Sequence, residues 1–235
     1  MSPFISEFIG TAFLLLLGTG VVGNILLNHS KGRNGGWIVI ALGWGIAVFT
    51  GVYVSAASSG AHLNPAVTLA FAATGKLSWS LVVQYILAQF AGAMFGAFLS
   101  WLVYRQHFDA TDDADLKLAV FCNAPAIRNP IQNLLTEIIA TCALVLGVFF
   151  LTGPENSLGS LDALPVALLV TGIGLSLGGP TGYAINPARD LGPRIMHFML
   201  PIKNKRDSDW SYSWIPVAGP VIGGFMAAFI WNILN

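Results

Sequence analysis

Six long apolar stretches constrain this chain more than any other feature, because each is long enough, or nearly so, to cross a lipid bilayer. A membrane-spanning helix needs about 20 predominantly apolar residues. The stretches are Phe4–Leu27, Trp37–Ala57, Trp79–Tyr104, Ile131–Thr152, Leu161–Gly178 and Trp214–Leu234. The first does not have the features of a cleaved signal peptide, since it lacks a basic start and a small-residue cleavage site. We therefore expect six transmembrane helices with both termini on one side.

The composition supports an integral membrane protein. Only 9% of the 235 residues are charged and 55% are hydrophobic, whereas a soluble domain carries about 25% charged residues. The 11 basic and 11 acidic side chains balance, so there is no basic excess to bind nucleic acid. Cys122 and Cys142 have neither a disulfide framework nor a metal-ligand spacing around them. We expect no cofactor and no metal.

The charged residues divide the chain into two halves. Residues 1–104 contain four charges, and the 24 residues from Arg105 to Arg128 contain seven. A hydrophilic segment of this kind is typical of a connecting loop. We therefore predict a single domain over 1–235, with a first repeat at 1–104, a connecting loop at 105–130 and a second repeat at 131–235.

Two further apolar segments, Asn64–Gly75 and Pro187–Leu200, are too short to cross a bilayer at about 1.5 Å per residue. Runs of this length are typical of re-entrant or interfacial segments. A Gly-, Ser- or Thr-rich approach precedes each of them, at 58–61 and at 178–182. Irregular backbone within a membrane is tolerated only where it faces protein or a water-filled cavity. The sequence thus predicts two half-helices that line a wet path.

The two halves repeat one another in sequence. The Glu-x-Ile-x-Thr pattern at 7–11 recurs 130 residues later, at 137–141. The Ala-Gly-x-x-x-Gly pattern at 91–96 recurs after 127 residues, and the Asn-Pro-Ala at 64–66 recurs after 122 residues. Three coincidences in the same order indicate an internal repeat. An odd number of crossings per repeat inverts the second copy, so the two half-helices should enter from opposite faces and meet near the midplane.

The Asn-Pro-Ala triplets have a physical meaning as helix starts. Proline is well suited to the first helical position, and asparagine is a favoured N-cap. A single copy in a soluble protein would indicate only a capped helix, but two copies at matched positions of an apolar repeat indicate more. Two helix N-termini that meet direct positive dipole ends at one point. The Asn amides can then donate hydrogen bonds to a passing oxygen atom.

The segments that precede the triplets are expected to be extended strands with a ladder of carbonyl acceptors. The predicted ladder residues are Gly60, Ala61, His62, Leu63, Gly182, Ala184 and Ile185. Acceptors along one side and two amide donors at the centre suit small neutral hydroxylic molecules. A bare ion would find too little to replace its hydration shell.

On these residues the chain resembles the aquaporin, or major intrinsic protein, family along essentially its whole length. The motifs are Ser-Gly-Ala-His-Leu-Asn-Pro-Ala-Val-Thr at 59–68 and Gly-Tyr-Ala-Ile-Asn-Pro-Ala-Arg-Asp at 182–190. The resemblance implies an all-α membrane fold of six tilted helices and two re-entrant half-helices, assembled as a homotetramer with one pore per subunit. The implied pore centre is Asn64, Pro65, Ala66, Asn186, Pro187 and Ala188.

The resemblance also implies an outer selectivity filter at Trp44, Gly174, Tyr183 and Arg189, placed by their spacing from the two motifs. This pattern and Asp190 look like the glycerol-conducting branch, in which the Gly174 position is expected to make room for a carbon backbone. Trp44 and Tyr183 would form an apolar corner, and Arg189 would donate hydrogen bonds to hydroxyl groups. The branch more often has Phe where this chain has Tyr183.

Other ionisable residues allow two interpretations each. Glu7 and Glu137 could relay protons or could accept hydrogen bonds from the backbone of the re-entrant loops; their symmetric placement and the resemblance favour the second. His62 could be a pH gate or could order its loop. The Asp residues at 109, 112, 113 and 115 could bind Ca²⁺ but lack the EF-hand spacing, which favours a solvated loop.

The function we expect is a passive channel for small neutral solutes and water, not an enzyme. Glycerol and water are the first candidates, followed by urea, dihydroxyacetone and undissociated lactic acid. The alternative is a secondary transporter, since inverted repeats and broken helices also build transporters. A bacterial plasma membrane is the expected location. With cytoplasmic termini, Lys76 would be the only basic residue of an inner loop, contrary to the positive-inside tendency.

Overall fold

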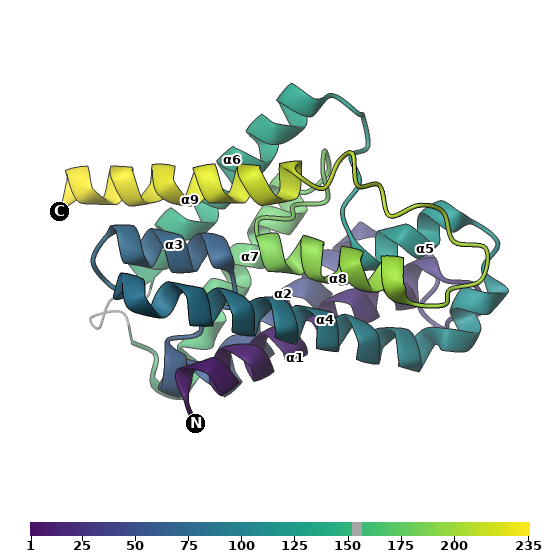
Figure 1. The fold of residues 1–235 in the computed structure, drawn as a ribbon, viewed down its shortest axis with the longest axis horizontal. Helices are drawn as coiled ribbons and strands as arrows, with labels where there is room; N and C mark the ends of the chain where they lie inside the picture. The colour runs from purple at the N-terminus through teal and green to yellow at the C-terminus, as the bar shows by residue number, and fades with distance from the viewer. Residues whose placement is uncertain (152–156) are drawn as a thin grey trace.

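The computed structural model describes residues 1–151 and 157–235, and these residues form helices, turns and connecting loops without a β-strand (Figure 1). The α-helices are α1 (Pro3–Leu26), α2 (Trp37–Ser59), α3 (Pro65–Ala73), α4 (Trp79–Ala110), α5 (Ala114–Phe121), α6 (Pro130–Leu151), α7 (Ala163–Leu177), α8 (Pro187–Met199) and α9 (Ile215–Leu234). The predicted all-α fold class is confirmed. Thr152, the last residue of one expected span, lies outside the described residues.

Five of these helices, α1, α2, α4, α6 and α9, are long and apolar enough to cross a membrane by length and composition. The span expected at Leu161–Gly178, the fifth along the chain, is shorter than predicted, because α7 has only 15 residues. A 3₁₀ turn, η2 (Gly159–Leu161), occupies the beginning of the apolar run, and Gly178 is the C-cap. The helix therefore starts at Ala163 and ends at Leu177.

Helices of the two repeats pair in the same way. In the first repeat α1 packs along α4, and in the second α6 packs along α9; α2 and α7 join the two halves. The glycines of the repeated Gly-x-x-x-Gly pattern allow these helices to approach closely. A Cβ atom on Gly92 would lie 2.3 Å from the carbonyl oxygen of Phe8, and one on Gly223 would lie 2.4 Å from that of Ile138.

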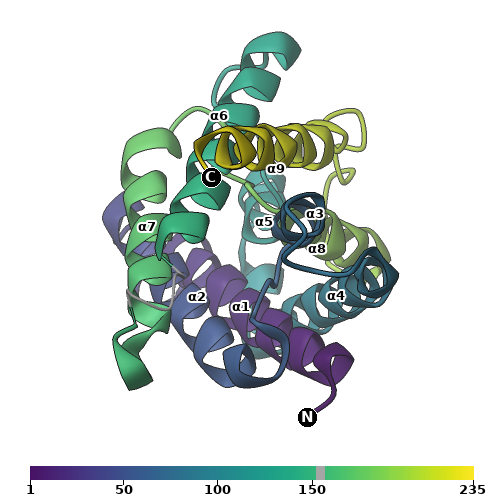
Figure 2. The same ribbon diagram turned by 90° about the vertical axis from the view of Figure 1, so that its left-hand side faces the viewer.

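The half-helices α3 and α8 lie end to end through the middle of the molecule. They follow one line in Figure 1, and in Figure 2, which looks along that line, α3 lies in front of α8. Each packs against a helix of the other repeat, α3 against α9 and α8 against α4. Their N-termini meet at the centre of the molecule, which brings Asn64 and Asn186 together.

The connecting segment contains more structure than the loop that the sequence predicted. Helix α4 continues to Ala110, and α5 occupies Ala114–Phe121. Helix α5 forms because the Asp113 carboxylate caps its first turn, accepting hydrogen bonds from the backbone N–H groups of Asp115 (2.9 Å) and Leu116 (3.2 Å). Its other face is covered, since Lys117 and Phe121 are both buried.

Several basic residues at this end of the molecule, opposite the termini in Figure 1, are bound within the protein. The Lys205 ammonium group donates to the carbonyl oxygens of His197 (2.6 Å), Phe198 (2.7 Å) and Leu200 (2.7 Å), at the C-terminus of α8. The buried Lys117 donates to the Lys203 carbonyl oxygen at 2.6 Å. Cations at a helix C-terminus stabilise the helix dipole. These two lysines therefore stabilise the end of α8 and the loop that follows it.

Candidate functional site

A cavity of about 640 Å³ takes its lining from α1, α2, α6, α7 and both re-entrant segments. Its wall contains Asn64 and Asn186, together with Trp44, Tyr183 and Arg189 of the predicted filter. Most of the remaining lining is aliphatic. The cavity therefore joins, in one apolar space, polar groups that are far apart in the sequence.

At the centre, hydrogen bonds of both the amide oxygen and the amide nitrogen fix Asn64 and Asn186. Their side-chain oxygens cap α3 and α8, accepting from the Ala66 N–H at 2.9 Å and the Ala188 N–H at 3.0 Å. The Nδ2 group of each donates across the centre at 2.8 Å, from Asn64 to the Ile185 carbonyl and from Asn186 to the Leu63 carbonyl. An amide nitrogen has two N–H donors, so each Asn keeps one that no described residue accepts and that a molecule in the cavity can use. Pro65 and Pro187 follow as first residues of the helices.

The segments that precede the two Asn-Pro-Ala triplets, 60–63 and 182–185, are here called the approach segments. They are not the extended strands that we expected. Positive φ angles occur at matched positions of the repeats, at Gly60, Ala61 and Leu63 in the first and at Gly182, Tyr183 and Ile185 in the second. A non-glycine residue in this region costs about 1–3 kcal/mol. Where a residue with positive φ follows or precedes one in the right-handed region, successive backbone N–H groups point toward the same anion. This arrangement is an anion-binding nest. Here the anions are Glu7 and Glu137.

Both carboxylates are buried and hold the approach segments through hydrogen bonds. Glu7 accepts from the N–H groups of His62 (2.9 Å) and Leu63 (2.7 Å). Glu137 accepts from the N–H groups of Ala184 (3.0 Å) and Ile185 (2.9 Å). Because a buried charge is tolerated only when it is well bonded, these contacts stabilise the charges and the strained loops together.

The sequence reasoning missed the side chains that complete the two carboxylate sites. The Ser59 and Thr181 hydroxyls donate to Glu7 and Glu137, each at 2.6 Å, from equivalent positions of the repeats. The Gln89 amide adds a fourth donor to Glu7 at 2.8 Å. A comparison of Ser59 with Thr181 in the aligned repeats could have found that pair, whereas Gln89 has no such signal in the sequence.

His62 packs against side chains of α3 and α4. Its Nδ1 atom lies 3.1 Å from the Thr68 hydroxyl, and its ring centroid lies 4.6 Å from that of Phe71 and 5.1 Å from that of Tyr85. Three neighbours on one small ring restrict its motion. This environment favours loop ordering over a pH gate.

Trp44 and Arg189 form one wall of the predicted filter. The guanidinium carbon of Arg189 lies 4.1 Å from the centroid of the Trp44 ring, within cation–π distance. The other side of the indole lies on Gly18 of α1, where a Cβ atom would come within 2.2 Å of the ring. The Nη1 atom of Arg189 is buried without a hydrogen-bond partner among the described residues. That donor is therefore unused by the described residues.

Gly174 has a different place from the one we expected. It is absent from the cavity wall, and a Cβ atom there would lie 2.8 Å from Cζ and 2.9 Å from the hydroxyl oxygen of Tyr183. The space that the missing side chain leaves is thus filled by the Tyr183 ring. Gly178 acts in the same way, since its Cβ would lie 2.4 Å from Cδ1 of that ring. Gly174 makes room for a tyrosine, which in turn lines the cavity.

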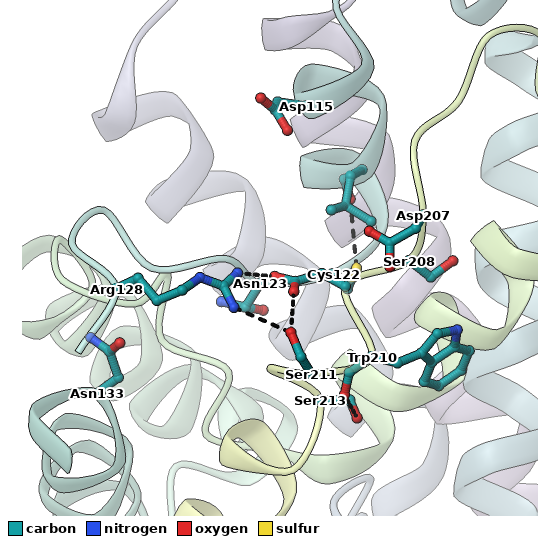
Figure 3. A network of polar contacts seen from close by, with 12 residues as sticks. Asp115, Cys122, Asn123, Arg128, Asn133, Asp207, Ser208, Trp210, Ser211 and Ser213 are labelled. Atoms are coloured by element: carbon teal, nitrogen blue, oxygen red, sulfur yellow. Dashed lines mark hydrogen bonds and ion pairs between the residues drawn. The ribbon is translucent and has the colours of Figure 1, made fainter. Parts of the chain in front are cut away.

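A buried polar network supports the second re-entrant segment, and one of its members, Asn123, is labelled in Figure 3. The Asp190 carboxylate accepts from Arg194 Nε at 2.8 Å and from the Asn123 backbone N–H at 2.7 Å. The Asn123 amide donates to the Thr181 carbonyl at 3.0 Å. Gly182 allows this contact, because its Cβ would lie 2.5 Å from that amide nitrogen. Asp190 therefore has a structural role beside the filter. Gly182 contacts this network and does not line the cavity.

The comparisons with known proteins agree with this geometry. A family model described as major intrinsic protein matches residues 1–231. The chain belongs to this family. A Thermotoga maritima protein named "Probable glycerol uptake facilitator protein" is 55% identical over 234 residues, which cover 100% of both chains. A "D/L-lactic acid transporter" of Lactiplantibacillus plantarum is 37% identical over 232 residues, covering 97% of this chain and 95% of the relative.

A solved structure gives the same result for the fold. The X-ray structure of the aquaglyceroporin from Plasmodium falciparum matches with a TM-score of 0.87 and 31% sequence identity, over 97% of this chain and 94% of that one. The major intrinsic protein fold is therefore shared along nearly the full length of the chain. Within the described residues, no cluster of three His, Cys, Asp or Glu side chains could hold a metal ion.

Proposed function

We propose that this chain is a passive membrane channel for small neutral solutes, with glycerol and water as the main permeants. The observation that carries the proposal is the pair of Asn amides at the centre of the cavity, each with one N–H free. Two donors and two helix N-termini at one point favour an oxygen atom and repel a cation.

The filter supports a solute that has one polar and one apolar side. Trp44 and Tyr183 contribute aromatic surface to the cavity, and Arg189 contributes an unpaired donor. A polyol can place its carbon atoms against the rings while its hydroxyl groups accept from the guanidinium. The names of the relatives, a glycerol uptake facilitator and a lactic acid transporter, agree with solutes of this size.

A passive channel accounts for the two membrane carboxylates better than a secondary transporter does. A transporter needs a coupling site for Na⁺ or H⁺ near the midplane. Both Glu7 and Glu137 are occupied by backbone and side-chain donors of the re-entrant loops. We infer that neither is free to bind a coupling ion.

The proposal extends to assembly and location. A homotetramer with one pore per subunit is part of the proposal, and a bacterial plasma membrane is supported by the bacterial relatives and the five long apolar helices. Large apolar side chains such as Ile38, Ile46 and Phe229 are exposed on these helices. Lipid or neighbouring subunits would cover them in the membrane.

Stopped-flow light scattering on proteoliposomes tests the proposal. Glycerol and water should both cross faster than in empty liposomes, without a Na⁺ or H⁺ gradient and without saturation at low glycerol concentration. The same protein in planar bilayers should carry no K⁺ or H⁺ current above background. A need for an ion gradient, or a reproducible cation current, would contradict the proposal.

Lactic acid gives a second test. Only the neutral acid should cross, because the carboxylate would lose its hydration and would be held by Arg189. Its flux should therefore fall about tenfold per pH unit above the pKa of the acid, as the neutral fraction falls. Equal uptake at pH 4 and pH 7 would contradict permeation of the neutral species.

A further inference from the structure

Trp37, the first residue of α2, contacts the filter from behind without lining the cavity. Its indole N–H donates to the Gly174 carbonyl oxygen at 2.8 Å, which links the start of α2 to the last turns of α7. This contact joins residues that are 137 positions apart in the sequence. It is the kind of contact that sets the distance between two helices.

The same indole also packs on the filter aromatic. The ring centroids of Trp37 and Tyr183 are 5.9 Å apart and their planes are inclined at 79°, an edge-to-face arrangement. The two rings meet over Gly178, where a Cβ atom would lie 2.4 Å from Tyr183 Cδ1 and 2.8 Å from Trp37 Cζ2. Tyr183 is thus enclosed by Gly174, Gly178 and Trp37.

Tyr183 needs such support, because its own backbone does not favour its position. Its φ angle is +42°, in the left-handed region. Its hydroxyl group is buried and has no hydrogen-bond partner among the described residues. Neither the local backbone nor a hydrogen bond of the hydroxyl fixes the ring, so the packing around it must do so.

We propose that Trp37 is a specificity-determining positioning residue, which sets the width of the filter by holding the Tyr183 ring and the Gly174 carbonyl in place. This inference rests on the proposed channel function. Loss of the indole would free the far side of the Tyr183 ring, which could then move away from Arg189. Bulkier polyols would gain more from the added width than glycerol, whereas water, the smallest permeant, would gain least.

The experiment compares Trp37→Leu with the parent protein and with Trp79→Leu in proteoliposomes that contain equal amounts of folded protein. Trp79 is a matched control: it is also the first residue of a long helix and is exposed, and no side-chain hydrogen bond or ring contact joins it to another described residue. The readout is the ratio of erythritol to glycerol permeability. A defect in folding alone lowers both fluxes together and leaves this ratio unchanged.

We expect Trp37→Leu to raise the ratio about fivefold, which corresponds to about 1 kcal/mol at 1.36 kcal/mol per tenfold change. Trp79→Leu should leave it at the parent value. A Trp37→Leu ratio equal to or below that of the parent would overturn the inference. If that variant does not fold, Trp37→Phe, which keeps a ring and loses the N–H, should raise the ratio about twofold, and a parent-like ratio would overturn the inference equally.

The outcome also separates this inference from the proposed function. A parent protein that passes glycerol, with an unchanged ratio in the variants, contradicts only the role of Trp37. A parent that passes water but no glycerol contradicts the glycerol proposal. The role of Trp37 is then tested by the ratio of urea to water permeability, which should rise in Trp37→Leu and stay unchanged in Trp79→Leu.

Discussion

Asn64 and Asn186 each donate a hydrogen bond to the re-entrant segment that precedes the other, at 2.8 Å in both cases. The acceptors are the carbonyls of Ile185 and Leu63, which lie directly before the two Asn residues in the sequence. Each half-helix is therefore tied to the loop of the opposite repeat. These two hydrogen bonds orient the amides, and they also hold the two repeats together at the centre of the molecule.

The first prediction concerns this exchange of bonds. Asn64→Asp and Asn186→Asp keep the oxygen that caps each helix and remove the donor, so a carboxylate oxygen would face a carbonyl oxygen. Each variant should lose about 2 kcal/mol of unfolding free energy in detergent, and glycerol flux should fall. Chemical denaturation measures the first and light scattering the second. Asn232→Asp, at an exposed position of α9, should lose little. A large loss in one variant only would contradict the reciprocal arrangement.

The second prediction concerns the carboxylates. Glu137→Gln would replace one acceptor oxygen by an NH₂ group, which would face N–H or O–H donors from Thr181, Ala184 or Ile185. A buried donor left without an acceptor costs about 1–3 kcal/mol. We expect lower thermal stability and a loss of solute flux, and the same for Glu7→Gln. Retained stability with altered proton dependence of flux would favour a proton relay instead.

The third prediction tests the place of Gly174. Gly174→Ala puts a Cβ atom 2.8 Å from Tyr183 Cζ, so the ring must shift toward the cavity. Glycerol permeability should then fall relative to water, by about tenfold for each 1.36 kcal/mol added to its barrier. Gly174→His should lower the ratio further. Gly172→Ala on the same helix has no atom within 4 Å of its new Cβ and serves as the control.

An unchanged glycerol-to-water ratio in Gly174→Ala would show that the Tyr183 ring can yield in another direction. A change of equal size in Gly172→Ala would show that α7 responds to any added side chain. Either result would contradict the close fit between Gly174 and Tyr183.

The fourth prediction concerns pH and the loop between α8 and α9. Asp209 forms an ion pair with Arg128, which also reaches Ser211 in Figure 3. Partial burial acts to raise the pKa of Asp209, but hydrogen bonds from Arg128 and Ser211 outweigh it and hold that pKa below its usual value. A carboxyl with a lowered folded-state pKa stabilises the fold above its unfolded pKa of about 3.9. That contribution is lost as the pH falls through the folded-state pKa.

Asp209→Asn should therefore cost about 2 kcal/mol of unfolding free energy at pH 7, and the difference from the parent should shrink as the pH falls below about 4. Asp207→Asn in the same loop is the control, because its carboxylate is exposed and lies 3.7 Å from Arg206. The measurement is thermal unfolding in detergent at a series of pH values. A difference that stays constant down to pH 2 would contradict the ion-pair account.

The sequence predicted the layout of the protein because its signals are local or periodic. Apolar length located the long helices, and Asn followed by Pro marked the starts of α3 and α8, since capping depends on adjacent residues. The repeat spacing predicted that the half-helices meet. It does not predict α5, because the apolar run of that helix is short and an Asp-rich segment around Asp113 is typical of a solvated loop.

The tertiary structure decided how the site is held, because those contacts join residues that no local rule connects. The sequence indicates open space at Gly174, yet Gly174 contacts the Tyr183 ring, and Gly18 contacts the Trp44 ring in the same way. A missing Cβ has no sequence signature that says which distant ring fills it. The two repeats also differ in detail, since the Tyr85 hydroxyl donates to the Ser59 carbonyl whereas Asn123 donates to the equivalent Thr181 carbonyl. The sequence by itself determined which residues meet at the centre, through helix starts and symmetry; packing between distant helices alone decided the shape of the path beside them.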